Sequence, residues 1–193
     1  MSTNTQSAMK SICGHLLIFS LLLIFLQSFQ SQLIFHREAI HAGEFWRILT
    51  GSFVHTNYFH LFLNLAGIVF IAFLFKDYLS VKTFYVSLFL TSLTVGIGLY
   101  CFNKPLQWYA GLSGSLYGLY IVSASFALRS KDYISSLPII IGIPAKLLFD
   151  SIYPNLTEHS AELIGAPIAN VAHLYGAIAG LCISIFMAGT GKK

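Results

Sequence analysis

One serine in this sequence lies in a setting that suits a nucleophile. Ser113 follows Gly111 and Leu112 and precedes Gly114, where a short polar stretch gives way to a long apolar run. Glycines on both sides let the backbone turn tightly around a reacting carbonyl. Glycine and serine are also common packing residues in membrane helices, so the motif by itself fits either role. Its chemistry depends on which other side chains can reach Ser113.

Three further polar side chains stand near the starts of apolar runs, namely His60, Asn64 and His173. A histidine can take the proton of a serine hydroxyl, and imidazole or amide N–H groups can stabilise an oxyanion. Singly, each residue is more simply explained as a structural one that bonds a neighbouring carbonyl. Jointly they favour a functional site, because polar groups are costly in a bilayer and tend to mark such sites.

The composition indicates an integral membrane protein. Of 193 residues, 56% are hydrophobic and 9% are charged, and the mean hydropathy is +0.74, whereas soluble domains carry about a quarter charged residues. A membrane-spanning helix needs about 20 mostly apolar residues. Six runs qualify, near residues 12–34, 58–75, 83–102, 112–128, 134–153 and 169–188. With short connectors and no repeat, we expect one all-α, polytopic bundle of six transmembrane helices over residues 1–193.

The first run is longer than a signal-peptide core and lacks an Ala-x-Ala cleavage site, so we predict a retained helix. The three cysteines, Cys13, Cys101 and Cys182, lie within apolar runs or at their ends. They are odd in number and show no metal-ligand spacing, which predicts buried free thiols.

Lysine and arginine predict the orientation of the bundle. The side that holds the N-terminus carries seven, and the other side three; the seven are Lys10, Lys76, Lys82, Arg129, Lys131, Lys192 and Lys193, and the three are Arg37, Arg47 and Lys104. By the positive-inside rule both termini are cytoplasmic. The same topology explains the net charge of +4 without a nucleic-acid partner. It also brings the starts of the second, fourth and sixth helices, with all four polar side chains, to the outer leaflet.

Two glycine stripes predict a close helix contact. Gly114 and Gly118 lie four apart in the fourth helix, and Gly176 and Gly180 lie four apart in the sixth. Small residues at this spacing let two helix backbones approach closely in lipid. We therefore expect the two helices to touch, which would carry His173 toward Ser113.

These motifs, taken in order, resemble the rhomboid family of intramembrane serine proteases. The matching residues are Trp46-Arg47, His55, His60-x-x-x-Asn64, Gly111-Leu112-Ser113-Gly114 with Tyr117, and Ala172-His173-x-x-Gly176-x-x-x-Gly180. The compact six-helix form, the short loops and the run from Lys146 to Asp150 are most similar to the rhombosortase branch. The chain departs from many bacterial rhomboids in carrying Gly51 where they have a further histidine.

The resemblance implies a Ser-His dyad in which Ser113 attacks a peptide carbonyl and His173 is the general base. It also implies that Tyr117 packs on the His173 ring, and that the Ser113 backbone N–H, His60 and Asn64 bind the oxyanion. We expect water to reach these groups and His55 through a cavity open to the outer face, with Gly111 and Gly114 in supporting roles. No cofactor is implied, and no metal site is predicted, because the histidines lack matching carboxylates or thiols at ligand spacing.

Two regions suggest how a substrate would be selected. Lys146 and Asp150 are four apart within an apolar run, so we expect an ion pair. Structural neutralisation is the simpler explanation of the pair, and a part in choosing the cleavage region is the sharper hypothesis. The loop from His36 to Asn57 is too polar to span, and its Trp46 is expected at the membrane interface, in family terms beside the active site.

The resemblance implies a bacterial inner membrane, an active site toward the periplasm, and membrane-anchored substrates with a C-terminal transmembrane tail. Such a tail would carry a Gly-Gly-containing motif, one hydrophobic helix and a basic end, and its cleavage would release an exported protein. A catalytically inactive rhomboid-like membrane chaperone and, less well supported, a six-helix transporter stay open as alternatives. The sequence does not indicate an oligomeric state.

Overall fold

The computed structural model describes residues 3–190 and confirms an all-α membrane bundle. Its long helices are α1 (Thr3–Gln27), α5 (Tyr58–Leu74), α6 (Val81–Phe102), α7 (Ser113–Arg129), α8 (Tyr133–Ile152) and α10 (Asn170–Thr190). Each lies on one of the six apolar runs identified in the sequence. The expectations for the extreme ends of the chain, including Lys192 and Lys193, lie outside the described residues.

Length and composition alone show that several of these long helices can cross a membrane. Among the described residues, α6, α8 and α10 are each long and apolar enough to cross a bilayer. A fourth span results if α5 is joined to the helical segment Arg47–Phe53, from which it turns by 85°. The apolar part of α1, Ile12–Gln27, is shorter. Six complete crossings therefore stay a prediction.

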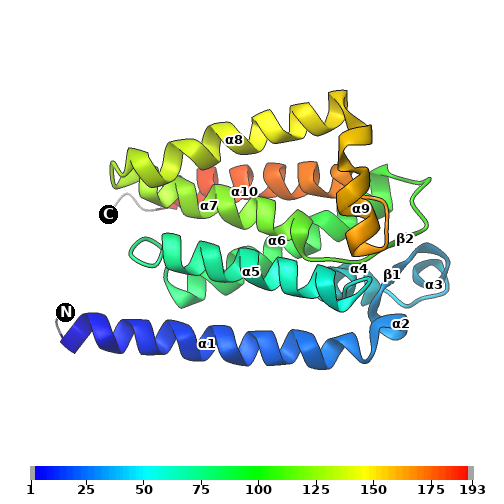
Figure 1. Cartoon of the computed structure of the whole chain (residues 1–193), viewed down its shortest axis with the longest axis horizontal. Coiled ribbons are helices and arrows are strands. Elements are labelled where there is room, and N and C mark those ends of the chain that lie inside the picture. Colours follow the sequence, from blue (N-terminus) through cyan, green and yellow to red (C-terminus); the bar gives the residue numbers. More distant parts are fainter. Residues whose placement is uncertain (1–2, 191–193) are drawn as a thin grey trace.

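The short elements gather at one end of the bundle (Figure 1). They are α2 (Gln30–Leu33), β1 (Phe35–His36), α3 (Arg37–His41), α4 (Arg47–Thr50), η1 (Gly51–Phe53), β2 (Trp108–Tyr109), η2 (Pro154–Thr157) and α9 (Glu158–Ile164). The first and last described residues both lie at the opposite end (Figure 1). An even number of crossings would produce this arrangement.

The first apolar run is interrupted, unlike the single helix predicted over residues 12–34. α1 ends at Gln27, and α2 begins at Gln30. The Gln27 side chain donates to the carbonyl of His55 at 2.6 Å and accepts from the His55 N–H at 2.9 Å. These two bonds satisfy loop backbone that has no helical partner, and they explain why a glutamine stands where the helix stops.

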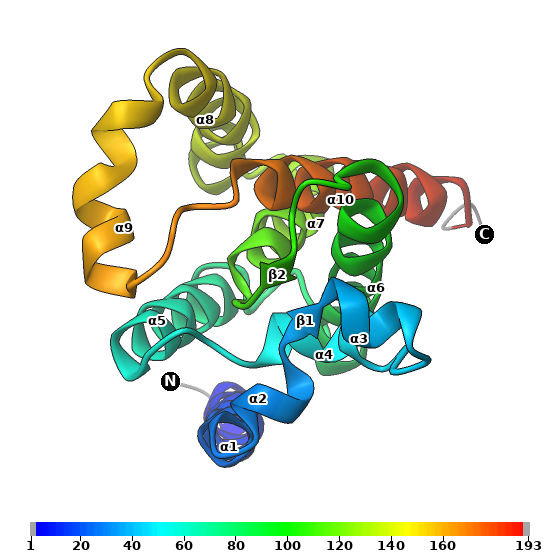
Figure 2. The ribbon, with the colours of Figure 1, turned by 90° about the vertical axis from the view of Figure 1, so that its right-hand side faces the viewer.

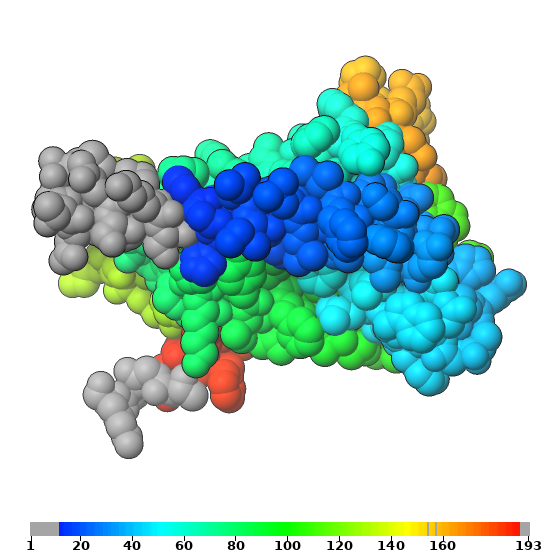
Figure 3. Space-filling model, turned by 90° about the horizontal axis from the view of Figure 1, so that it is seen from below, coloured from blue at the N-terminus to red at the C-terminus, as the bar shows by residue number. Residues whose placement is uncertain are grey.

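The centre of the bundle is α7, which packs against α5, α6, α8 and α10 (Figure 2). Its apolar residues Leu116 and Leu119 are buried together with Leu61 and Ile68 of α5. α1 lies on the outside, along the surface seen from below (Figure 3), and contacts α5. The residues of α7 are therefore the ones most completely removed from lipid.

The predicted contact between the fourth and sixth helices is confirmed. A Cβ atom on Gly176 would lie 1.8 Å from the carbonyl oxygen of Gly114, and one on Gly180 would lie 2.3 Å from that of Gly118. No side chain fits between backbones this close. α7 and α10 accordingly share the most extensive helix contact in the described chain.

α8 is packed far less tightly than its neighbours. Of its described residues, only Ser136 and Asp150 are buried, although the helix contacts both α7 and α10. Pro138 and Pro144 both lie inside this helix, and each removes one backbone hydrogen bond. Little of the helix is therefore held by protein contacts.

The prediction of buried thiols was wrong. Cys13, Cys101 and Cys182 are free and lie exposed on the surface of the bundle. An apolar run in a membrane protein has a lipid-facing side as well as a buried side, and a small apolar thiol is tolerated on either.

Candidate active site

The structure brings Ser113 and His173 into hydrogen-bond contact. The Ser113 Oγ and His173 Nε2 atoms lie 2.9 Å apart, although the residues are 60 positions apart in the sequence. Ser113 is the first residue of α7, and His173 lies in the first turn of α10. The glycine contact between these helices sets the spacing that brings the two side chains together. A serine hydroxyl and an imidazole at this distance can exchange a proton.

One stacked ring and one nitrogen without a hydrogen-bond partner in the described chain define the setting of the His173 ring. The Tyr117 ring, one turn after Ser113, stacks on it with centroids 4.4 Å apart and planes 6° apart. The other ring nitrogen, Nδ1, is buried and has no hydrogen-bond partner among the described atoms. Within residues 3–190 a stacked tyrosine, rather than a bonded carboxylate, thus restrains the ring that faces Ser113.

Gly111 shapes the turn ahead of Ser113. Its φ of +125° lies in a region that side chains disfavour, and a Cβ atom there would come within 2.8 Å of His60 Nε2. The backbone N–H of Gly111 donates to the carbonyl of Gly51 at 3.1 Å. Glycine therefore allows both the turn and the close approach of the His60 ring.

Tyr109 is a site residue that the sequence analysis missed. Its hydroxyl donates to the carbonyl of Gly111 at 2.7 Å, and burial raises the pKa of the phenol, so the donor stays protonated. The antiparallel pairing of β1 with β2, Phe35 opposite Tyr109, holds the residue in place. The sequence does show a tyrosine two residues before Gly111, but nothing in it predicts the pairing with a strand more than 70 residues away that holds this tyrosine in place.

A cavity of about 310 Å³ opens beside the pair. Its lining includes Ser113, His173 and His60, the loop before α7 and the segment that joins α9 to α10. His55 and Asn64, which we expected in this lining, do not belong to it. The cavity is large enough to admit water and an extended stretch of peptide.

His55 and Asn64 instead stand behind His60. The His55 ring is completely buried and meets the His60 ring edge-on, with centroids 5.0 Å apart. The Asn64 amide donates to the carbonyl of His60 at 3.1 Å, within its own helix. Of the three predicted residues in α5 and its preceding loop, only His60 reaches the cavity.

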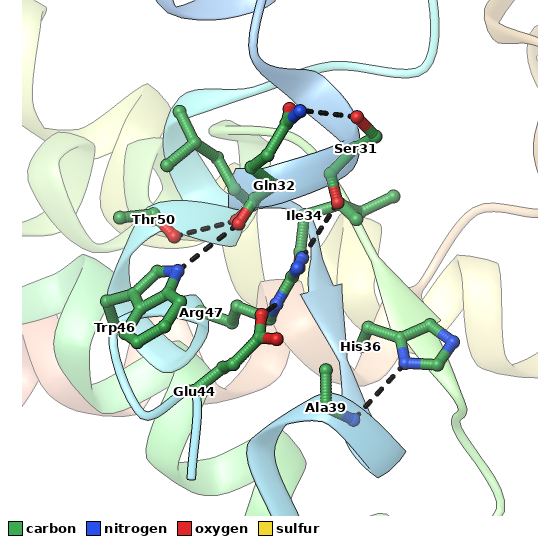
Figure 4. A network of polar contacts seen from close by, with 10 residues as sticks. Ser31, Gln32, Ile34, His36, Ala39, Glu44, Trp46, Arg47 and Thr50 are labelled. Atoms are coloured by element: carbon green, nitrogen blue, oxygen red, sulfur yellow. Dashed lines mark hydrogen bonds and ion pairs between the residues drawn. The ribbon is translucent and has the colours of Figure 1, made fainter. Parts of the chain in front are cut away.

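The loop containing Trp46 is held by backbone carbonyls (Figure 4). Trp46 is 52% exposed, and its indole donates to the carbonyl of Gln32 at 3.2 Å. Arg47 is buried, and it donates to the carbonyls of Ser31 and Ile34, each at 2.9 Å. This places Trp46 on the loop surface, outside the cavity lining.

Gly51, the departure from many bacterial rhomboids, also has a structural explanation. A Cβ atom at this position would lie 2.7 Å from the backbone nitrogen of Phe35. β1 therefore occupies the space that a side chain at position 51 would need.

The ion pair expected in the fifth long helix is present. Lys146 Nζ lies 2.7 Å from Asp150 Oδ2, with the carboxylate buried and the lysine side chain 58% exposed. Lys146 also lines a cavity of about 260 Å³ together with Tyr117, which stacks on His173. The pair thus stands one aromatic ring away from the candidate base.

Among the described residues no three His, Cys, Asp or Glu side chains are grouped closely enough to hold a metal ion. The side chains that line the cavity include the hydroxyl of Ser113 and the imidazoles of His60 and His173.

The fold and site together define a helical membrane protein with a serine and a histidine in contact at one end of two touching helices. The Rhomboid domain family matches residues 42–190, which is most of the chain. The chain therefore belongs to the rhomboid family, a family of intramembrane serine proteases that act on membrane protein substrates. No curated protein sequence matches it at a significant level.

Proposed function

We propose that this rhomboid is an active intramembrane serine endopeptidase that uses Ser113 and His173 as a catalytic dyad. The 2.9 Å contact between Ser113 Oγ and His173 Nε2 carries the proposal. His173 Nε2 would take the hydroxyl proton as Oγ attacks the peptide carbonyl, and would return it to the leaving amine. Water would then hydrolyse the acyl-enzyme with the same histidine as base.

The oxyanion would meet donors on two sides. The Ser113 backbone N–H belongs to the first turn of α7, where amides have no acceptor within the helix and the helix dipole favours negative charge. The His60 ring lies over Gly111 and lines the cavity, which supports it as a second donor. Asn64 is the third candidate: one of its two amide N–H groups bonds the carbonyl of His60, and the other would have to reach the cavity, which Asn64 does not line.

We place the site toward the periplasm of a bacterial inner membrane, with both termini in the cytoplasm. The support is the positive-inside count, together with the position of the first and last described residues opposite the short elements that surround the site (Figure 1). The cavity would then open to periplasmic water.

The proposed substrates are exported proteins held by a C-terminal transmembrane tail, as the rhombosortase resemblance implies. A regular helix hides its carbonyls in hydrogen bonds, so a cleavable segment has to unwind near the outer face, and glycines favour unwinding. Removal of the tail would release the protein from its temporary anchor.

Lys146 and Asp150 would contribute to substrate selection, with Trp46 at the interface. The support for the pair is its place beside the Tyr117 cavity on a loosely packed helix. The test compares cleavage of a tailed substrate with cleavage of unrelated membrane segments by the Lys146→Ala, Asp150→Ala double variant. An unchanged ratio would reject selection by this pair.

Covalent labelling tests the proposed nucleophile. A fluorophosphonate probe should label purified protein at Ser113, and labelling should vanish in Ser113→Ala and His173→Ala. Ser125→Ala is a matched control in the same helix, because the Ser125 hydroxyl bonds only the carbonyl of Ile121 at 2.7 Å in the described chain. Folded protein that takes up no probe would indicate the inactive chaperone, and labelling of another serine would overturn the dyad.

Co-expression with a tailed protein tests the substrate class. Mass spectrometry of the exported protein should show a new C-terminus near the start of its hydrophobic segment, and the Ser113→Ala enzyme should leave the tail intact. An unprocessed tail with an enzyme that still labels at Ser113 would reject the rhombosortase assignment and leave the protease intact.

A further inference from the structure

Two residues just before α5 hold the end of α9. The Thr56 hydroxyl donates to the carbonyl of Ile164, and the Asn57 amide donates to the carbonyl of Leu163 at 3.1 Å. Both carbonyls belong to the last turn of α9, where the carbonyl groups of a helix have no N–H partner within the helix. The segment that lines the cavity after α9 is therefore tied to the first turn of α5.

Thr56 is at the same time bonded to the candidate oxyanion donor. Its Oγ1 lies 3.0 Å from His60 Nδ1. A hydroxyl has one proton to donate and lone pairs to accept with, whereas a carbonyl can only accept. Since the Thr56 proton goes to Ile164, the Thr56–His60 bond requires the proton to be on His60 Nδ1.

This proton count determines what His60 presents to the cavity. A neutral imidazole carries one N–H, so a proton on Nδ1 leaves Nε2 as an acceptor. Nε2 and Cε1 form the ring edge that lies over Gly111, at 2.8 and 2.6 Å from a Cβ position there. The oxyanion hole needs a donor at this edge. With Thr56 bonded to Ile164, the hole is therefore incomplete.

We infer that Thr56 is a positioning residue that sets the tautomer of His60 according to whether the end of α9 is in place. The inference rests on the proposed protease function, in which His60 is an oxyanion donor. When Ile164 moves away from Thr56, the hydroxyl can rotate and donate to Nδ1. The Nδ1 proton is released to water as Nε2 takes one up, so no net proton is gained or lost. His60 then presents an N–H to the cavity.

The substrate itself would cause this change. Ile164 lines the same cavity as Ser113 and His173, so a peptide that fills the cavity must displace or press on the segment after α9. The second donor would then form only when a scissile carbonyl is present. An empty site would have a nucleophile and a base without a complete oxyanion hole.

Nitrogen NMR of histidine-labelled protein reads the tautomer directly. In the unliganded enzyme, the His60 signal, identified by its loss in His60→Gln, should report Nδ1–H. After reaction with a fluorophosphonate, whose phosphonyl oxygen mimics the oxyanion, it should report Nε2–H. Nε2–H in the unliganded enzyme, or Nδ1–H in the adduct, would overturn the inference. If Ser113 takes up no probe, the proposed function fails, while the unliganded spectrum still tests Thr56.

Two substitutions at Thr56 distinguish the effect of the hydroxyl from that of the side-chain shape: valine keeps the shape, and serine keeps the hydroxyl. Thr56→Val should abolish the preference for Nδ1–H and lower kcat about tenfold with KM nearly unchanged, a smaller loss than removing an oxyanion donor outright. Thr56→Ser should restore both. Thr50→Val is the matched control, because its hydroxyl donates to the carbonyl of Leu33 at 2.7 Å, away from the cavity. Wild-type tautomer and kcat in Thr56→Val would contradict the role.

Discussion

The α7–α10 interface and α8 are held in opposite ways. α7 and α10 meet through glycines, backbone against backbone, and carry Ser113 and His173 at one end. α8 carries two prolines, and within the described chain it buries only Ser136 and Asp150. Proton transfer needs two atoms held within a few tenths of an ångström, whereas a substrate helix needs space to approach. The contrast indicates a rigidly held Ser113–His173 pair beside a loosely packed helix that can move.

The same substitution should act very differently in the two regions, and its largest effect is expected in α10. In Gly176→Ala the new methyl group would overlap the carbonyl oxygen of Gly114, 1.8 Å away. The helices must separate, which lengthens the Ser113–His173 contact. We expect cleavage of a tailed substrate to fall about a hundredfold, since small misplacements have costs of this size.

Gly189→Ala is the control for this experiment, because it lies in the same helix and its Cβ atom would meet no described atom within 4 Å. Its cleavage rate should match that of the wild type. A Gly176→Ala enzyme with full activity would show that the glycine contact does not set the distance between the two side chains.

Substitutions in the Lys146–Asp150 pair test how much this ion pair of α8 contributes to the stability of the folded protein. Lys146→Ala leaves a buried carboxylate without its partner, so the folded protein should lose about 2 kcal/mol of stability. Asp150→Ala leaves a lysine that already reaches the surface, and should be milder. Thermal unfolding in detergent measures both, and equal losses would mean that burial of Asp150 does not govern the pair.

Stacking within the rigid region should have a moderate effect. Tyr117→Ala removes the ring that lies on His173, and an aromatic contact of this kind is worth about 0.5–1.5 kcal/mol. We expect kcat to fall about fivefold. Tyr117→Phe keeps the ring and should behave as wild type in the same assay, so a loss in that variant would point to the hydroxyl instead.

Gly142→Ala, in α8, should show the smallest effect on the rate. A Cβ atom there would meet no described atom within 4 Å, and alanine favours a helix over glycine by about 1 kcal/mol. We expect a slightly higher unfolding midpoint and a cleavage rate within about twofold of the wild type. A loss comparable to that of Gly176→Ala would erase the distinction between the two regions.

Much of the fold was predictable because a membrane restricts the possibilities. Long apolar runs have to become helices in lipid, and glycines four apart mark where helices meet. The contact between α7 and α10 through their glycines was therefore correctly expected. The exposure of Cys101 and Cys182 was not, because the hydrophobic pattern of a membrane helix does not separate its buried side from its lipid-facing side.

The candidate site was predictable in part. Ser113, His173 and Tyr117 could be brought together from helix spacing and family resemblance. Asn64 and His55 were predicted on the same grounds but lie outside the cavity lining. The direction in which a side chain points depends on its hydrogen bonds, such as the one from Asn64 to the carbonyl of His60. Tyr109 and Thr56 were missed because both act through partners on other segments.

The amino-acid sequence by itself determined the membrane environment, the long helices, the glycine-lined contact and the candidates for nucleophile and base. These follow from local composition and short spacings. Only the tertiary structure decided that Tyr109 holds the turn before Ser113, that β1 excludes a side chain at position 51, and that Thr56 joins His60 to the end of α9. Each of these depends on hydrogen bonds or steric contacts between segments distant in the chain, whose partners are chosen when the helices pack.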